Sequence, residues 1–436
     1  MTTRRILISL LALFLALGLA APAAARVYID ITSPFSRKLP LALPEFQALD
    51  GAAADPFGAQ ASGLLKRYLG YTGLFDFMDP KTFLGPPEGE KINYRRWSRV
   101  GAELLITGEY KREGNVFALK LRLFDVTGAK QLVGRGYDGT LDKLGAAIAR
   151  FCDEVMLALT GERSIYSTMI AFVGARDGKK EIYLMRFDGT GVQQLTHRQD
   201  ISLYPAWSPD GALLSYSAYV NRRPAIMVHA LAGGSGKVVL NKPGVNLTPA
   251  FRPQHQGQLA AALSYTGKNN IFLIDLAGKV LKQLTNGWGI EVDPAFSPDG
   301  KKMAFVSDRG GSPQIYVLDL ASGSLRRLTF EHKYSAAPAW SPRGDRIAYQ
   351  AEVNRTFQVA TIRPDGSDLR ILTNGLGGGE NPTWSPDGRL IAYAGRKTGR
   401  YQIYLMTAGG EPITQLTKLP GDQSDPAWSP RGIMVK

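Results

Sequence analysis

The histidines are the side chains of this sequence best suited to bind a metal ion or to transfer a proton near neutral pH. The sequence repeats with a period of about 44 residues, and the histidines occupy different positions within that repeat. No two of them have the short spacing of zinc ligands. Cys152 is the one cysteine, so a cysteine pair cannot supply ligands either. We therefore expect no metal ion or other cofactor, and separate surface roles for His197, His229, His255 and His332.

Motifs for nucleophilic, phosphate-binding and metalloprotease chemistry do not occur in the sequence. There is no G-x-S-x-G elbow, no G-x-x-x-x-G-K-[ST] loop and no H-E-x-x-H helix. The glycine-rich stretch GLGGGEN at 375–381 has no helix pattern after it, which argues against a phosphate cradle. Cys152 lies on the apolar face of a predicted helix and is expected to be a buried packing residue. We therefore expect a protein that is not an enzyme.

The repeated Asp-Gly pairs are the remaining candidates for ligand chemistry. They occur in YPAWSPDG, DPAFSPDG and NPTWSPDG, and two further copies read SPRG. Proline presets φ and glycine supplies positive φ, so the pattern indicates a hairpin turn and not a metal site. A degenerate copy, AFRPQHQG at 250–257, lacks the aspartate altogether. A function that needs aspartate in every copy would fail there.

The repeat itself predicts the fold of most of the chain. The aromatic residue of the PAWSPDG-type motif recurs every 44 or 45 residues. The leucine of the last strand of each repeat, which we call the LT strand after its Leu-Thr pair, recurs with the same period at 195, 240, 284, 328, 372 and 416. Each period reads as four short strands separated by turns, which is typical of a propeller blade. The aromatic should pack between neighbouring blades. Its positions are Trp207, Phe251, Phe296, Trp340, Trp384 and Trp428.

The two ends of the repeat array complement each other. The first unit, 170–196, lacks an opening strand, and the last copy, DPAWSPRG at 425–432, is an opening strand with almost nothing after it. We predict that the C-terminal strand joins the first unit and closes a six-bladed ring, which removes free strand edges. The predicted fold is mainly β, with the propeller over 163–436 and a small α/β domain over 26–162 before it.

The α/β domain is predicted from helical and alternating patterns. Leucines and a tyrosine within PFGAQASGLLKRYLGY at 56–71 share one helical face, and 104–110, 115–124 and 131–137 read as a three-stranded meander. A last helix carries Cys152 on its apolar face. We expect Thr140 to cap that helix at its N-terminus and Gly161 to end it.

The first 25 residues read as a secretory signal peptide. A basic start is followed by an apolar run and the small residues Ala23 to Ala25, which predicts cleavage between Ala25 and Arg26. An uncleaved membrane anchor is the alternative. Removal of the segment would lower the net charge from +14 to +12, because it holds Arg4 and Arg5 and no acidic residue. For a basic exported protein we expect acidic protein or envelope partners and no nucleic acid. The alternative is that the positive charge only aids solubility.

The connectors between each LT strand and the next PAW strand differ from blade to blade. They span 197–204, 241–248, 286–293, 330–337, 374–381 and 418–425, and they should ring one mouth of the central channel. Their acidic and polar side chains favour a basic or mixed protein surface as the ligand. The alternative is that they are solvated loops without a ligand. The candidate residues are Asp200, Leu203, Tyr204, Asn246, Leu247, Thr248, Glu291, Val292, Asp293, Tyr334, Ala336, Glu380, Asn381, Ser424 and Asp425.

A signal peptide, an α/β domain and six PAWSPDG-type blades with an unfinished last copy together resemble the TolB family. The resemblance covers the whole mature chain, and it implies a periplasmic adaptor of the Tol–Pal cell-envelope system that maintains outer-membrane integrity and constriction at division. It also implies that the propeller mouth binds the outer-membrane lipoprotein Pal. The N-terminus would bind the periplasmic domain of the inner-membrane protein TolA. The implied TolA-binding residues are Val27, Tyr28, Ile29, Asp30, Ile31 and Thr32.

Two other functions remain open at this stage. Exported peptidase- or lyase-like enzymes also use propellers, although no segment here supplies a separate catalytic domain. A glycan-binding module is the other, since Tyr204 and Trp288 could be exposed aromatics. We expect a monomer that associates with the envelope through its partners.

Overall fold

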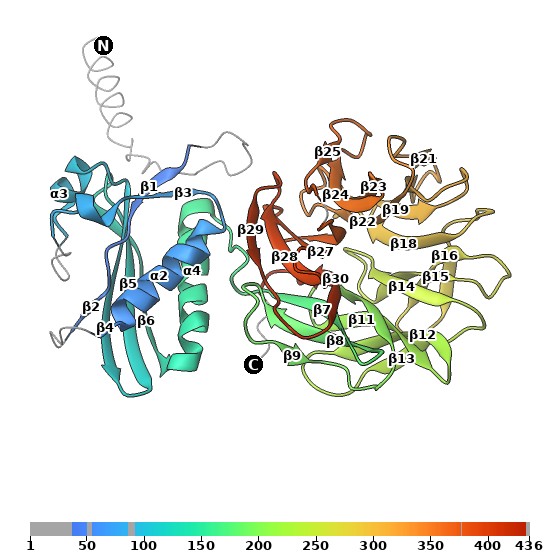
Figure 1. Ribbon diagram of the computed structural model, residues 1–436, viewed down its shortest axis with the longest axis horizontal. Coiled ribbons are helices and arrows are strands. Elements are labelled where there is room, and N and C mark those ends of the chain that lie inside the picture. Colours follow the sequence, from blue (N-terminus) through green and yellow to red (C-terminus); the bar gives the residue numbers. More distant parts are fainter. Residues whose placement is uncertain (1–36, 50–54, 86–91, 376, 433–436) are drawn as a thin grey trace, which may run out of the picture.

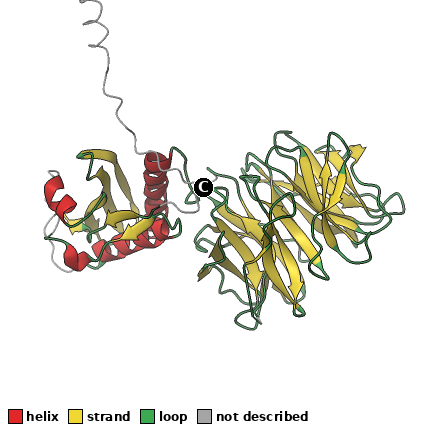
Figure 2. Cartoon of the chain, turned by 90° about the horizontal axis from the view of Figure 1, so that it is seen from above, coloured by secondary structure: helices red, strands yellow, loops and turns green. Residues whose placement is uncertain are grey.

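The computed structural model describes residues 37–49, 55–85, 92–375 and 377–432. The chain forms an α/β domain followed by a β-propeller (Figure 1). Seen from above, helices and a sheet make up the first part, and strands joined by loops make up the second (Figure 2). The predicted signal peptide, the cleavage site at Ala25 and Arg26 and the segment Val27 to Thr32 lie outside the described residues. Within the described residues, no helix has the length and apolar character needed to cross a membrane.

The N-terminal domain contains one mixed sheet with the strand order β3-β1-β4-β5-β6, and β2 pairs with β4. Helices α2 and α4 cover one face of this sheet, and α3 packs on the other through Trp97. The elements are β1 (Leu39–Ala42), β2 (Gln47–Ala48), α2 (Phe57–Gly70), β3 (Phe75–Phe77), η1 (Pro80–Thr82), α3 (Tyr94–Arg99), β4 (Leu104–Glu113), β5 (Val116–Asp125), β6 (Lys130–Thr140), η2 (Leu141–Lys143) and α4 (Leu144–Thr160).

The predicted meander and both long helices are confirmed, with one correction at the start of α4. Alternate residues of β5, from Phe117 to Leu123, are buried against α2 and α4 because side chains of a strand point to opposite faces in turn. Gly161 ends α4 with a φ of 78°. The prediction that Thr140 caps α4 is wrong. A 3₁₀ turn, η2, intervenes, and the Thr140 hydroxyl donates to Asp142 and caps no backbone N–H.

The propeller contains six four-stranded antiparallel sheets, as the repeat predicts. Inner strands of neighbouring blades contact each other around a closed ring. In chain order the blades are β10 (Ser202–Trp207), β11 (Leu213–Val220), β12 (Arg223–Ala230), β13 (Lys237–Leu240); β14 (Asn246–Phe251), β15 (Gln258–Leu263), β16 (Asn270–Asp275), β17 (Val280–Gln283); β18 (Glu291–Phe296), β19 (Lys302–Ser307), β20 (Gln314–Asp319), β21 (Leu325–Arg327); β22 (Ser335–Trp340), β23 (Ile347–Val353), β24 (Thr356–Ile362), β25 (Arg370–Ile371); and β26 (Glu380–Trp384), β27 (Leu390–Gly395), β28 (Gln402–Thr407), β29 (Pro412–Gln415).

The sixth blade joins the two ends of the array, which confirms the predicted closure. Its strand order is β30-β7-β8-β9, with β30 (Asp422–Trp428) from the C-terminus and β7 (Met169–Arg176), β8 (Lys179–Arg186) and β9 (Gln193–Gln194) from the start of the propeller. Trp428 pairs with Ile170, and Asp422 pairs with Ala175. This closure satisfies the edges of both end units.

Two repeated side chains stabilise the propeller, one between blades and one within a blade. The indole N–H of Trp207 donates to the carbonyl oxygen of Ala427 at 2.9 Å, and that of Trp384 donates to Ala339 at 3.1 Å. Each acceptor belongs to the preceding blade, so the motif aromatic links neighbours as predicted. The LT threonine acts within its own blade, where the Thr329 hydroxyl accepts from the Ile315 amide at 2.9 Å. The SPDG segments form hairpin turns, in which Ser297 donates to Asp299 at 2.5 Å.

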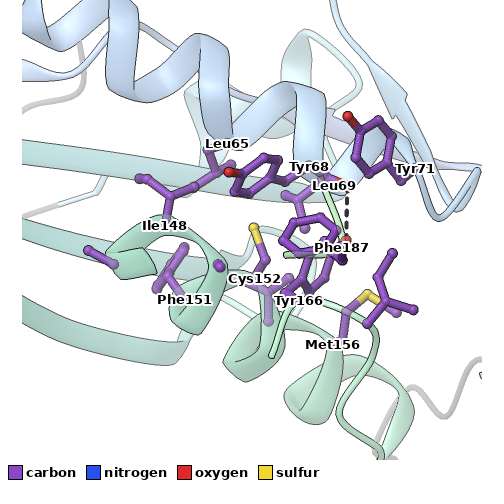
Figure 3. Packing of buried hydrophobic residues seen from close by; sticks show 14 of the residues in the cluster. Leu65, Tyr68, Leu69, Tyr71, Ile148, Phe151, Cys152, Met156, Tyr166 and Phe187 are labelled. Atoms are coloured by element: carbon purple, nitrogen blue, oxygen red, sulfur yellow. Dashed lines mark hydrogen bonds between the residues drawn. The ribbon is translucent and has the colours of Figure 1, made fainter. Parts of the chain in front are cut away.

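The α/β domain contacts the propeller through Tyr68 of α2. Its ring lies 4.9 Å from Phe187 and 6.3 Å from Tyr166 between centroids, and the Tyr166 hydroxyl donates to the Tyr68 carbonyl at 3.1 Å (Figure 3). The Tyr68 hydroxyl donates to Asp188, in the turn between β8 and β9. The Arg389 guanidinium, in the turn between β26 and β27, donates to the α2–β3 loop at 3.4 Å. Because strands in a blade alternate in direction, these turns lie on the face opposite the connectors, and the connector mouth stays uncovered by this domain.

Candidate partner-binding mouth of the propeller

The residue before each motif proline has a positive φ in all six blades. The angles lie between 48° and 55°, in the left-handed region that L-residues rarely adopt. A β-branched threonine and a tyrosine are among them, which makes the conformation costly at those positions. The six residues, which we call the pre-proline ring, are Tyr204, Thr248, Asp293, Ala337, Asn381 and Asp425.

A β-bulge in each inner strand produces this ring. In β18, Val292 pairs with Val306 and Ala295 pairs with Ala304, so Asp293 and Pro294 together oppose one residue. The other inner strands show the same register shift at the same place. Proline is compatible with this position because the inner strand is an edge strand and the bulge needs no amide donor there. The bulge therefore presents two consecutive residues per blade at the axis.

The pre-proline ring and its prolines line a cavity of about 170 Å³ in the central channel. Six equivalent pairs, one from each blade, form the whole lining. Tyr204 is followed around the ring by Thr248 and Asp293, and Asp425 lies opposite Asp293 across the axis. The cavity is therefore narrow. Its backbone repeats six times around the axis, whereas its side chains differ from blade to blade.

Two carboxylates dominate the electrostatics of this cavity. Burial, together with the charge of Asp425, raises the pKa of Asp293 to about 6. Burial also raises the pKa of Asp425, opposed by a hydrogen bond from Ser424 at 2.9 Å and by the Asn381 amide, which donates to the same carboxylate. Burial and both aspartates raise the pKa of Tyr204 to about 12. A cationic group or hydrogen-bond donor entering the channel would relieve this repulsion.

Asn246 and Glu291, two of the predicted site residues, are fully buried below the mouth. The Asn246 amide donates to the carbonyls of Pro224 and Lys242, and the Glu291 carboxylate pairs with Arg309 and accepts from the Gly287 amide at 3.2 Å. These contacts shape the connectors from beneath. We therefore do not propose direct partner contacts for these two residues.

The remaining candidates lie in three environments. Tyr204, Thr248, Asp293, Asn381 and Asp425 belong to the pre-proline ring. The residues that directly precede the ring in the chain pack between blades or are partly exposed near the mouth; they are Leu203, Leu247, Val292, Ala336, Glu380 and Ser424. Among them, the Glu380 carboxylate accepts from the Tyr401 hydroxyl at 2.6 Å. Asp200 is exposed, and Tyr334 is partly exposed with its ring 5.2 Å from Phe357.

Sequence reasoning missed two features of the mouth. Ala337 occupies the sixth place of the ring, and the six prolines line the cavity with it. The signal was available, since each ring residue directly precedes a motif proline. The predicted connectors were also too long at their ends, because β10 begins at Ser202 and the other inner strands begin similarly early. The last residues of each predicted connector are therefore part of the inner strand.

Other candidate positions are spread over the molecule. The expected surface role of His229 is wrong, because it is buried in β12, where burial lowers its pKa. His197 and His255 are exposed. The residues that the structure describes contain no group of three His, Cys, Asp or Glu able to hold a metal ion. A larger hollow of about 510 Å³ lies on the open sheet face of the N-terminal domain. Its buried Arg122 pairs with Glu109 at 3.1 Å, so its main charges already compensate each other.

Comparison with known sequences places both domains in one family. The family described as "TolB beta propeller domain" matches residues 157–432, and the one described as "TolB amino-terminal domain" matches residues 27–132. The chain belongs to the TolB family. The resemblance drawn from the motifs and the predicted fold class are therefore both confirmed.

Individual members of the TolB family agree with this assignment. The Tol-Pal system protein TolB of Desulfosudis oleivorans is 42% identical over 288 residues, which cover 64% of this chain and 65% of that protein. This match thus spans less than two thirds of the relative. A protein TolB homolog of Chlorobium luteolum is 36% identical over 72% of this chain and 71% of its own length. The crystal structure of TolB from Acinetobacter baumannii matches with a TM-score of 0.74 and 27% identity, over 91% of this chain and 98% of that one.

Proposed function

We propose that this protein is a non-enzymatic periplasmic adaptor of the Tol–Pal system, which binds the lipoprotein Pal at the connector mouth of its propeller. Membership of the TolB family supports the system, and the name of the Desulfosudis oleivorans relative connects that family to Tol–Pal. The uncovered mouth and its asymmetric lining support the place of binding. In this role the protein maintains outer-membrane integrity and constriction during division.

The pre-proline ring is the observation that carries the proposal. Six residues hold left-handed conformations, and two carboxylates face each other where burial disfavours their charge. Both features lower the free energy of unfolding, and such costs concentrate where proteins bind ligands. The lining offers acceptors, so the matching element of Pal would present hydrogen-bond donors or a basic group to the axis.

Calorimetric titration of residues 26–436 with the soluble domain of Pal tests this proposal. We expect saturable binding that Asn381→Ala weakens by about 10-fold or more, because the variant removes a ring side chain at the mouth. Asp299→Asn is the matched control, since Asp299 lies in a hairpin turn on the opposite face. Absence of binding by the folded wild-type protein would refute the proposed function.

We propose further that the N-terminal residues Val27 to Thr32 bind the periplasmic domain of TolA. This segment lies outside the described residues, and the proposal draws on family membership and on the extended character of the sequence RVYIDITSPF. Deleting residues 26–35 should abolish capture of TolA and leave Pal binding intact. Equal TolA binding by the deleted and complete proteins would contradict this assignment.

A further inference from the structure

Trp288, on a connector at the mouth, is the most exposed large apolar side chain among the residues that the structure describes, ahead of Phe330 on the next connector. Its side chain is 89% exposed, and Ile290, on the same connector, is 55% exposed. The other five tryptophans are buried or partly buried. A large aromatic residue that folding leaves in water marks an interaction site more often than a scattered small apolar residue does.

The connector that carries Trp288 is held rigidly by groups other than the indole. The Gly287 amide donates to Asn270 at 2.9 Å, and the Ile290 amide donates to Asp308 at 2.6 Å. The Glu291 amide donates to the Asn269 carbonyl at 3.1 Å. A β-carbon at Gly289 would clash with the Asp308 carboxylate, so the backbone lies tightly against the neighbouring turn. The exposed tip is thus preorganised, which lowers the entropic cost of binding.

Exposed cations lie over Trp288 of this tip and over Tyr265 of the turn between β15 and β16. The Lys268 ammonium lies 3.8 Å from the centroid of the Trp288 ring, and the Lys242 ammonium lies 5.7 Å from that of Tyr265, which is 36% exposed. The nearby acidic groups are engaged, Glu291 with Arg309 and Asp308 with the Ile290 amide. The Trp288 patch, defined as Lys242, Tyr265, Lys268, Trp288 and Ile290, is therefore apolar and basic, whereas the channel beside it is acidic.

We propose that the Trp288 patch is an off-axis anchor for Pal, which receives the indole in an apolar pocket edged by carboxylates. The inference rests on the proposed function and adds a second contact to it. The mouth then selects its partner by charges of opposite sign at two places, which are acidic at the axis and basic at the Trp288 patch. A glycan is the other occupant of an exposed aromatic residue, and the tests below distinguish it from Pal.

The affinity test compares wild-type protein, Trp288→Ala and Leu281→Ala in titrations with the soluble Pal domain. Leu281 is the control, as an apolar residue 41% exposed on β17 of the preceding blade. We expect Trp288→Ala to weaken binding about 10- to 30-fold, mainly through faster dissociation, with Leu281→Ala unchanged. Lys268→Glu should slow association and alter its salt dependence. Binding by Trp288→Ala within about twofold of wild type would overturn the anchor and leave the proposed function standing.

Fluorescence provides a test that needs no substitution. Acrylamide quenches exposed tryptophan most strongly, and here that residue is Trp288. Saturating Pal should protect a large part of the quenchable emission of this protein, measured with a tryptophan-free Pal domain. Binding without protection would overturn the anchor, as would protection by soluble peptidoglycan fragments in place of Pal. Failure of wild-type protein to bind Pal at all would overturn the proposed function itself, and the anchor with it.

Discussion

At the scale of single residues, the channel carboxylates work against folding. Asp293 and Asp425 come from opposite blades, and each is disfavoured in its charged form by burial. A carboxylate whose pKa rises on folding binds more protons in the folded state than in the unfolded state between the two pKa values. The free energy of unfolding then falls as pH rises through that interval. For Asp293 the interval runs from its ordinary value of 3.8 to about 6.

Asp293→Asn should therefore stabilise the protein at pH 7.5 by about 1–3 kcal/mol. The amide keeps the shape and can still accept from the Ala337 backbone, but it carries no charge. At pH 4 the difference should vanish, because wild-type Asp293 is then protonated in the folded state. Urea denaturation of both proteins at the two pH values measures the effect.

The same substitution at Asp299 should have the opposite sign. There a hydrogen bond from Ser297 and backbone amides lower the pKa of an exposed carboxylate, so the charged form is favoured on folding. Asp299→Asn should be neutral or slightly destabilising at pH 7.5. Destabilisation by Asp293→Asn at pH 7.5 would contradict the idea that the channel charge opposes folding.

At the scale of elements, the bulged inner strand is the device that builds the mouth. It places a left-handed residue before proline in each blade, and it turns that side chain and the proline toward the axis. The same strand holds the neighbouring blade through the motif aromatic two residues after the proline. One short element thus combines a strained recognition position with a packing position.

Ala337→Gly should stabilise the protein by about 0.5–1 kcal/mol, because glycine adopts the φ of 50° at Ala337 without steric cost. Ala339→Gly, two residues later in the same strand, should destabilise it by a similar amount, since extended backbone gains nothing from glycine. Equilibrium unfolding in urea separates the two. An Ala337→Gly variant less stable than wild type would show that the left-handed position is not strained.

At the scale of the whole molecule, stability depends on closing the ring. Strand β30 supplies the inner strand of a blade whose other strands come from the start of the propeller. The indole of Trp428 also donates to Thr168 at 2.9 Å, in the linker that follows α4. The C-terminal strand therefore joins the ends of the array and touches the connection between the domains.

A chain ending at residue 421 should lose cooperative unfolding and Pal binding, because it lacks β30, leaves the edge of β7 unpaired and removes the packing of β30 against β26 and β10. Calorimetry and near-ultraviolet circular dichroism would detect the change. A chain ending at residue 432 is the control and should behave as wild type. An unaltered transition in the shorter chain would contradict closure by β30.

Tyr68 couples the two domains, and Tyr68→Ala should uncouple them. Loss of the ring removes contacts with Phe187 and Tyr166 and should cost about 3–5 kcal/mol. We expect a single calorimetric transition to separate into two, one for each domain. Tyr68→Phe keeps the ring and loses only the hydrogen bond to Asp188, so its transition should stay single. Separate transitions already present in wild type would contradict the coupling.

The sequence by itself determined the number of blades, the unfinished last copy and the closure of the ring. These features follow from a period of 44 residues and from the turn chemistry of SPDG, which are local and repeat along the chain. The meander of the N-terminal domain and the end of α4 at Gly161 follow in the same way from alternation and from a single backbone preference.

Only the tertiary structure decided which connector residues face the axis. The side chains of Asn246 and Asp425 both appear polar and available in sequence, yet one is buried under its loop and the other lines the channel. A bulge reverses which residues point inward, and a one-residue change in register cannot be read from a hydrophobic pattern. The coupling of Asp293 with Asp425 and the exposure of Trp288 depend on distances between different blades, which the periodic sequence leaves unspecified.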